Sequence, residues 1–115
     1  MFPELHFLET LLEPLEKYAR ISTPVKIPYA GKEFPIHTIS FGNDDPRAPT
    51  LALIGGIHGQ EKIGSQVVLS FLESLTELLQ WDESTHHILK HMRMVFLPIA
   101  NPVGMYLEQR ANGNG

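Results

Sequence analysis

The sequence predicts an α/β fold, because two apolar strands flank one long amphipathic helix in its second half. The first apolar run is TLALIGG, residues 50–56, and the second is MRMVFLPIA, residues 92–100. From residue 64 onward, apolar side chains recur at helical spacing, which indicates a helix that buries one face. A strand, a helix and a strand in that order form a βαβ unit, whose strands are parallel.

An amphipathic helix is expected at the N-terminus, followed by a hairpin. Pro14 should interrupt or kink the helix, to which we assign only a packing role. Two short strands, 25–29 and 34–41, flank the turn-like Ala30-Gly31-Lys32. Pro28 and Pro35 each remove a ladder donor, so at least one strand should lie at a sheet edge. The expected helix stripe consists of Leu5, Leu8, Leu12, Leu15 and Tyr18.

The polar loop 42–49 leads into the βαβ unit. Residues 50–56 form a short continuous apolar run, which predicts a strand covered on both faces. Residues 81–91 are expected to form a loop or a short helix before the second strand. The long helix should bury one stripe, made of Val67, Val68, Phe71, Leu72, Leu75, Leu78 and Leu79.

Composition limits the classes of partner. The 115 residues suit one domain, and 43% are hydrophobic, as in soluble globular proteins. The formal charge is −4 and the nine Lys and Arg residues are scattered along the chain, which argues against nucleic acid or an anionic membrane as partner. There is no cysteine, so any metal must be held by nitrogen and oxygen ligands.

The N-terminus does not have the pattern of a secretory signal. It carries four glutamates before its first lysine and has no basic segment ahead of its apolar residues. No window approaches the ~18 uninterrupted apolar residues of a membrane span. A cytoplasmic location is therefore expected, without a membrane partner.

Polar groups with ligand chemistry follow both strands of the βαβ unit. His58 and Glu61 come just after the first strand, while Asn101, Gly104 and Arg110 follow the second. Ligands of open α/β sheets bind beyond the carboxyl ends of the strands. We therefore expect these two stretches to converge on one edge of the sheet.

The first stretch has the features of part of a metal site. Gly55, Gly56 and Gly59 surround the histidine, which permits a tight turn and a close approach of the backbone to a ligand. If a helix begins near residue 60, His58 and Glu61 can point at one centre, and zinc accepts both imidazole and carboxylate. Two ligands do not complete a catalytic zinc site, which normally has three from the protein.

Two motifs resemble a known family. GGIHGQEKIG, residues 55–64, resembles the His-Gly-x-Glu segment of the zinc carboxypeptidases, the carboxypeptidase A-like metallopeptidases, and of the related succinylglutamate desuccinylases and aspartoacylases. NPVGMYLEQRANGNG, residues 101–115, resembles a later segment in which Asn-Pro-x-Gly precedes an arginine. His-x-x-Glu alone is weak, but the order and spacing agree from residue 51 to 115.

The resemblance implies both a fold and a site. The fold would be a mixed, mostly parallel sheet with flanking helices, incomplete here, with residues 1–115 as the N-terminal part of a single catalytic domain. His58 and Glu61 would be two of three zinc ligands. Arg110 would polarise the scissile carbonyl and stabilise the oxyanion formed when zinc-activated water attacks. Val103 replaces an aspartate common in carboxypeptidases, a departure that we regard as minor.

The family's third zinc-binding histidine and its catalytic glutamate lie downstream of the matching segment. This chain alone is therefore expected to be inactive, as a truncated piece or as one fragment of a cleaved enzyme that still binds its complementary C-terminal fragment. His86, His87 and His91 are poor substitutes, because they precede the second strand and so lie at the wrong edge of the sheet. His6 and His37 are interpreted as ordinary packed or surface histidines.

The leading functional hypothesis is a zinc-dependent hydrolase, a metallocarboxypeptidase that cleaves an amide bond beside a free carboxylate. An alternative is an N-acyl amino acid deacylase of the desuccinylase and aspartoacylase type. A non-catalytic α/β module that binds a metal or a partner is a third hypothesis. The module should have a complete core, whereas the enzyme hypothesis predicts an incomplete sheet with an exposed apolar edge.

Overall fold

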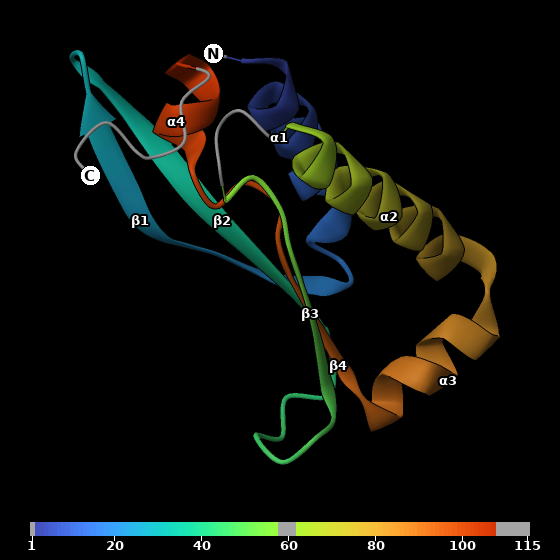
Figure 1. The fold of residues 1–115 in the computed structure, drawn as a ribbon. Coiled ribbons are helices and arrows are strands. Elements are labelled where there is room, and N and C mark those ends of the chain that lie inside the picture. Colours follow the sequence, from blue (N-terminus) through green and yellow to red (C-terminus); the bar gives the residue numbers. More distant parts are fainter. Residues whose placement is uncertain (1, 58–61, 108–115) are drawn as a thin grey trace.

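The computed structural model describes residues 2–57 and 62–107 and contains four helices and four strands in that part of the chain. The strands form one sheet in the order β1-β2-β4-β3. Helices α1 and α2 lie beside each other against this sheet (Figure 1). The element bounds are α1 Pro3–Leu15, β1 Ala19–Tyr29, β2 Lys32–Gly42, β3 Thr50–Ile54, α2 Lys62–Trp81, α3 Glu83–His91, β4 Arg93–Leu97 and α4 Pro102–Leu107.

Helix α1 starts with a proline and continues through another. Pro3 occupies the start, where a missing N–H costs nothing, and Pro14 falls in the last turn, one residue before the helix ends. The expected interruption is therefore a helix end, and Tyr18 lies beyond the helix rather than on its stripe. Leu5, Leu8 and Leu15 are buried, as the spacing predicts.

The hairpin β1–β2 is longer than expected, but its turn and its edge are as predicted. Ala30 and Gly31 both have positive φ, 53° and 77°, which matches the right-handed twist of a two-residue hairpin. Strand β1 is an edge strand and contains Pro28. Pro35 pairs only with Lys26 of β1, because β4 joins β2 farther along, at 39–42.

The βαβ unit is confirmed, since β3 and β4 are paired in parallel and α2 connects them together with α3. The resemblance implied a mostly parallel sheet. In the described residues the sheet is mixed, with β1–β2 and β2–β4 antiparallel and only β3–β4 parallel.

One prediction about β3 is wrong: neither of its faces is fully covered. Partners in a parallel pair point to the same side, so Leu51 lies on the side of buried Met94, and Ile54 lies on the side of Leu97. Leu51 is nevertheless 48% exposed and Ile54 52% exposed. The physical reason is position: β3 is the last strand of the described sheet, so no strand flanks it on its outer side.

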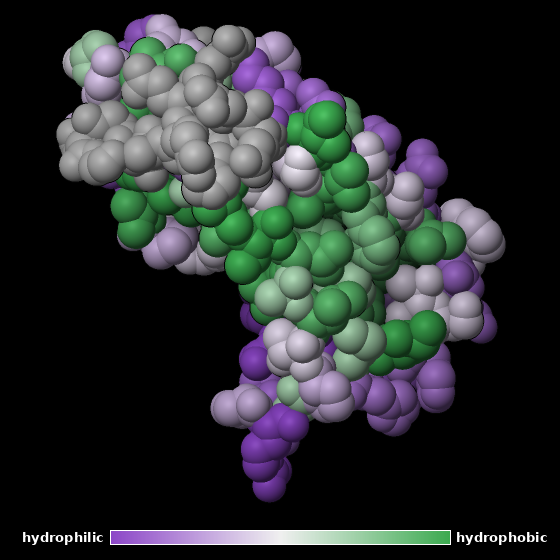
Figure 2. All heavy atoms as spheres, in the orientation of Figure 1, coloured by the Kyte–Doolittle hydropathy of each residue, from purple (hydrophilic) through white to green (hydrophobic). Residues whose placement is uncertain are grey.

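Helix α2 is buried on one side only. Val68, Leu72, Leu75 and Leu79 enter the core as predicted. Val67 is 62% exposed and Phe71 45% exposed, although both belonged to the expected buried stripe. We call the exposed apolar side of this helix the α2 flank; it consists of Ile63, Val67 and Phe71. Hydrophobic surface gathers where the start of α2 lies beside β3 (Figure 2).

Candidate functional site

The three residues assigned to catalysis and metal binding, His58, Glu61 and Arg110, lie outside the described residues. The structure does describe the segments around the first two. Strand β3 leads into Gly55, Gly56 and Ile57, and α2 begins at Lys62. These segments fix the positions of Ile57 and Lys62, the described residues on either side of the interval 58–61.

Backbone hydrogen bonds hold the ends of β3 and β4 together. The Gly55 amide donates to the Leu97 carbonyl, and the Ala100 amide donates to the Gly55 carbonyl, both at 2.9 Å. These bonds extend the parallel pairing beyond both strands. The predicted convergence of the two stretches on one edge of the sheet is confirmed for the residues that the structure describes.

Asn101 joins the loops that follow the two strands. It is buried, and its side-chain Nδ2 donates to the Ile57 carbonyl at 3.2 Å. Its Oδ1 accepts from the Gly104 amide at 2.9 Å and so caps the N-terminus of α4. Each fixed residue of the Asn-Pro-x-Gly motif therefore has a structural reason. Asn101 caps helix α4 and Pro102 is its first residue. Position 104 must be glycine, because a Cβ there would lie about 2.5 Å from the side chain of Asn101.

The start of α2 is fixed to the same edge. The hydroxyl of buried Ser65 donates to the Pro98 carbonyl at 2.7 Å. A Cβ on Gly55 would lie 2.8 Å from the Ser65 Cα and 2.9 Å from the Pro98 oxygen. Gly55 is thus required by the close approach of helix, strand and loop within the protein, a reason that the sequence did not indicate.

Gly56 has a second structural reason. Its φ is +67°, in the left-handed region, and a Cβ there would lie 2.8 Å from the Met105 sulfur of α4. This conformation turns the chain out of β3 directly before Ile57. The two glycines therefore set the direction of the backbone at Ile57. Asn101 was expected at this edge from its position after the second strand, whereas no sequence signal pointed to Ser65.

The chemistry of the donor set fits zinc, because zinc accepts an imidazole nitrogen and a carboxylate oxygen. Within residues 2–57 and 62–107, no group of three His, Asp, Glu or Cys side chains could hold a metal ion. His87 and His91 are exposed on α3, with ring centroids 5.0 Å apart, at the amino end of β4 as expected. They lie before β4, at the end of the strand opposite to the contact between Ile57 and Asn101.

The remaining histidines have ordinary environments. His6 is exposed on α1. His37 is buried in β2, where Nδ1 lies 2.8 Å from the Thr23 hydroxyl and Nε2 lies 3.1 Å from a Glu9 carboxylate oxygen. His37 therefore links α1 to the hairpin, in agreement with a packing role.

Together, the mixed sheet and the joined carboxyl ends of β3 and β4 define an α/β domain in which Ile57 and Asn101 meet at the edge where ligands of open α/β sheets bind. The family model described as zinc carboxypeptidase matches residues 8–114. The chain belongs to the zinc carboxypeptidase family.

Relatives in sequence and structure agree with this assignment. Carboxypeptidase E of Caenorhabditis elegans is 32% identical over 97 residues, which cover 80% of this chain and 21% of that protein. A metallo-carboxypeptidase from Burkholderia cenocepacia has a similar fold, with a TM-score of 0.75 at 16% identity over 99% of this chain and 31% of the other. An aspartoacylase family protein from Mesorhizobium loti is also similar, with a TM-score of 0.57 at 17% identity, covering 84% and 27% of the two chains. The chain thus spans about a fifth of the curated relative and under a third of both solved chains.

In the part of the chain that the structure describes, no helix is long and apolar enough to cross a membrane.

Proposed function

We propose that this chain supplies the N-terminal part of a metallocarboxypeptidase that removes C-terminal residues from peptides. Membership of the zinc carboxypeptidase family supports the hydrolase class. The single observation that carries the proposal is the hydrogen bond from Asn101 to the Ile57 carbonyl, because it joins the loop that leads to Arg110 to the residue before His58.

His58 and Glu61 would hold zinc in this proposal. Zinc, when bound, acts as a Lewis acid and supplies a nucleophile from water at neutral pH. Gly55 and Gly56 direct the chain toward this position, and Ser65 fixes the first turn of the following helix. Arg110 would stabilise negative charge that develops on the carbonyl oxygen of the substrate.

The exposed apolar edge favours the enzyme hypothesis over a free-standing module. Leu51 and Ile54 of β3 and the α2 flank leave apolar surface open, whereas the module hypothesis requires a complete core. We propose that a complementary C-terminal segment covers this surface and supplies the third zinc ligand and the general base.

The N-acyl amino acid deacylase remains the second candidate, because an aspartoacylase family protein shares the fold. The Asn-Pro-x-Gly stretch followed by Arg110 favours the peptidase, because that order resembles the carboxypeptidase motif more closely.

Hydrolysis by the full-length protein separates these functions. We expect release of the last residue from a peptide with a free C-terminal carboxylate, but neither from its C-terminally amidated form nor from N-succinyl or N-acetyl amino acids. Arg110→Ala should lower kcat by about 100-fold or more, while Arg47→Ala should leave it unchanged, because Arg47 contacts Asp45 in an exposed loop. Preferred hydrolysis of the N-acyl amino acids would support the deacylase, and full activity of Arg110→Ala would refute the role of Arg110.

A further inference from the structure

A basic hollow lies at the end of the sheet opposite the candidate zinc site. It adjoins Gly42, the last residue of β2, which pairs with Arg93 at the amino end of β4. Its volume is about 500 Å³, within the range of small-molecule sites. We call it the basic hollow; it is lined by Lys17, Tyr18, Arg20, Gly42, Asn43, Leu79, His86, Leu89 and Lys90.

The hollow concentrates positive charge in a chain whose net charge is −4. Lys17, Arg20 and Lys90 line it, and no carboxylate does. The ion pairs found across the described ranges are His37–Glu9 and Arg47–Asp45, so neither lysine is neutralised by an acidic partner there. Residues that are scattered along the sequence are thus brought together by the fold, and their mutual repulsion would be relieved by an anion.

Arg20 is held in position to receive such an anion. Its two terminal guanidinium nitrogens donate one hydrogen bond each: Nη1 to the Gly42 carbonyl and Nη2 to the Ser40 hydroxyl, both at 3.1 Å. A guanidinium has five N–H donors, so these two bonds orient the group and leave other donors for a ligand. Arginine fixed in this way loses little side-chain entropy on binding.

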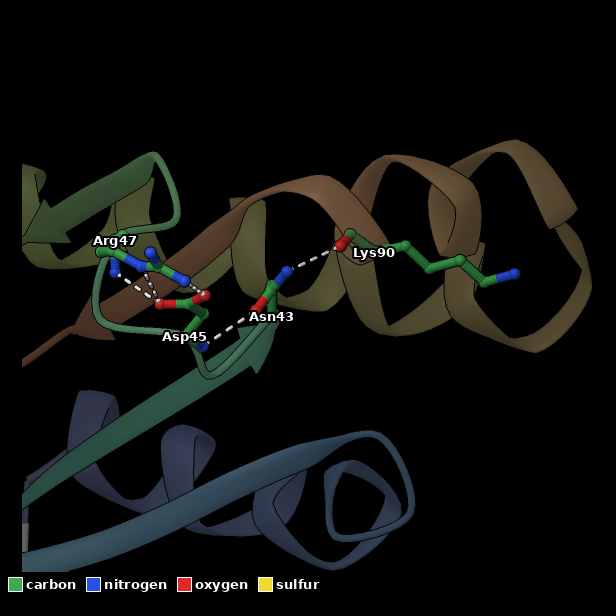
Figure 3. A network of polar contacts seen from close by, with 4 residues as sticks. All are labelled: Asn43, Asp45, Arg47 and Lys90. Atoms are coloured by element: carbon green, nitrogen blue, oxygen red, sulfur yellow. Dashed lines mark hydrogen bonds and ion pairs between the residues drawn. The ribbon is translucent and has the colours of Figure 1, made fainter.

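Side-chain hydrogen bonds connect the loop after β2 to the end of α3 beside Lys90. The Asn43 side chain donates to the Lys90 carbonyl at 2.9 Å, while its oxygen accepts from the Asp45 amide at 2.8 Å (Figure 3). Asp45 is itself engaged by Arg47. In this view the ammonium group of Lys90 extends away from the network and is not used by it.

The other side of the hollow is aromatic and apolar. Nε2 of His86 donates to the Leu79 carbonyl at 2.7 Å, which fixes the ring. The ring is tilted against Tyr18, with centroids 5.9 Å apart. Leu79 and Leu89, which also line the hollow, are buried. A ligand with a flat or apolar portion could pack here while its charged end meets the cations.

We propose that the basic hollow binds a small molecule that carries a phosphate group. A phosphate dianion offers several acceptor oxygens, which suit the fork of an arginine together with two lysine point charges. The cations line one hollow of limited volume, which fits a compact ligand better than a nucleic acid. The site shares no residue with the candidate zinc edge and does not depend on the proposed hydrolase activity.

Calorimetric titration with pyrophosphate and with phenyl phosphate tests this proposal at constant ionic strength. Lys17→Gln and Lys90→Gln remove the two lysine charges, and neither ammonium makes a contact that the fold needs. Lys26→Gln is the matched control, because it makes the same charge change at an exposed position of β1 outside the hollow. Succinate, a dicarboxylate, distinguishes phosphate from anions in general.

We expect binding of both phosphate compounds in the micromolar to millimolar range. Lys17→Gln and Lys90→Gln should each weaken it by about tenfold, and Lys26→Gln by less than about twofold. Succinate should bind at least about tenfold more weakly than phenyl phosphate, which carries a similar charge but presents three acceptor oxygens on one group. The proposal is overturned if neither phosphate compound binds, if Lys26→Gln weakens binding as much as the hollow variants do, or if succinate binds as tightly as phenyl phosphate.

Discussion

Asn101 donates a hydrogen bond to the carbonyl of Ile57 across the carboxyl ends of β4 and β3, with an N···O distance of 3.2 Å. The bond connects two loops that are 44 residues apart in sequence. It places the start of the first motif, residues 55–64, beside the start of the second motif, residues 101–115.

Replacing Asn101 should destabilise this junction. Asn101→Ala removes the cap on the Gly104 amide and leaves the Ile57 carbonyl without this donor, so we expect a loss of about 1–3 kcal/mol in the free energy of unfolding. Asn101→Ser keeps a capping oxygen and should lose less. Urea denaturation measures the loss of stability in each variant. Amide hydrogen exchange at residues 55–57 should become faster in both variants. Unchanged exchange would show that the bond from Asn101 does not hold this loop.

Gly42 and Gly31 allow backbone strain to be separated from crowding. Both have positive φ, +91° and +77°, but a Cβ on Gly42 would lie 2.3 Å from the Met92 carbonyl, whereas nothing lies within 4 Å at Gly31. Gly31→Ala should cost about 1 kcal/mol, the penalty of the left-handed conformation alone. Gly42→Ala should cost at least about 2 kcal/mol more, because strand and helix must separate. Equal unfolding midpoints would contradict the packing at Gly42.

The cap of α3 should give the protein a pH-dependent contribution to stability. Hydrogen bonds from the Ser84 and Thr85 hydroxyls lower the pKa of Asp82. A lowered pKa in the folded state means that this contribution is present above the ordinary aspartate pKa and is lost as pH falls through the folded value. From pH 5 to pH 3, the urea midpoint should therefore fall more in the wild type than in Asp82→Asn, which keeps the cap but cannot titrate. An identical fall in both proteins would exclude this contribution.

The uncovered edge of β3 should cause self-association of the isolated chain. Ile54→Lys and Val67→Lys place charge on exposed apolar surface and should reduce association without lowering the unfolding midpoint. Ile88→Lys is the control, because Ile88 is 54% exposed, about as much as Ile54, but lies on α3. Sedimentation velocity at several concentrations measures the effect. If Ile88→Lys reduced association equally, general solubility rather than this edge would be responsible.

Local patterns predicted the elements, whereas the surroundings of those elements could not be predicted. The turn at Ala30-Gly31 and the parallel pairing of β3 and β4 follow from turn chemistry and from periodicity. Leu51 and Phe71 belong to apolar patterns, but such a pattern does not show whether a neighbour covers it, so both proved to be exposed. The basic hollow was equally hidden, because Lys17 and Lys90 meet only in the fold.

For the candidate site, the convergence of the two loops was predicted and is confirmed in the described residues. The hydrogen bonds of Asn101 and Ser65 that hold the loops together were not predicted. A tight turn and a close approach to a ligand were the expected reasons for the glycines. The positive φ of Gly56 fits the turn, whereas Gly55 makes room for Ser65 and Pro98 within the protein. The roles of His58 and Glu61 stay predictions, because those residues lie outside the described ranges.

Zinc content per chain of the full-length protein tests the central claim most directly, by elemental analysis of wild type, His58→Ala, Glu61→Ala and the control His87→Ala. We expect one zinc ion per chain in the wild type and in His87→Ala. His58→Ala and Glu61→Ala should lose zinc, because each leaves the site with only two of its three protein ligands. Stoichiometric zinc retained in both His58→Ala and Glu61→Ala would contradict the account.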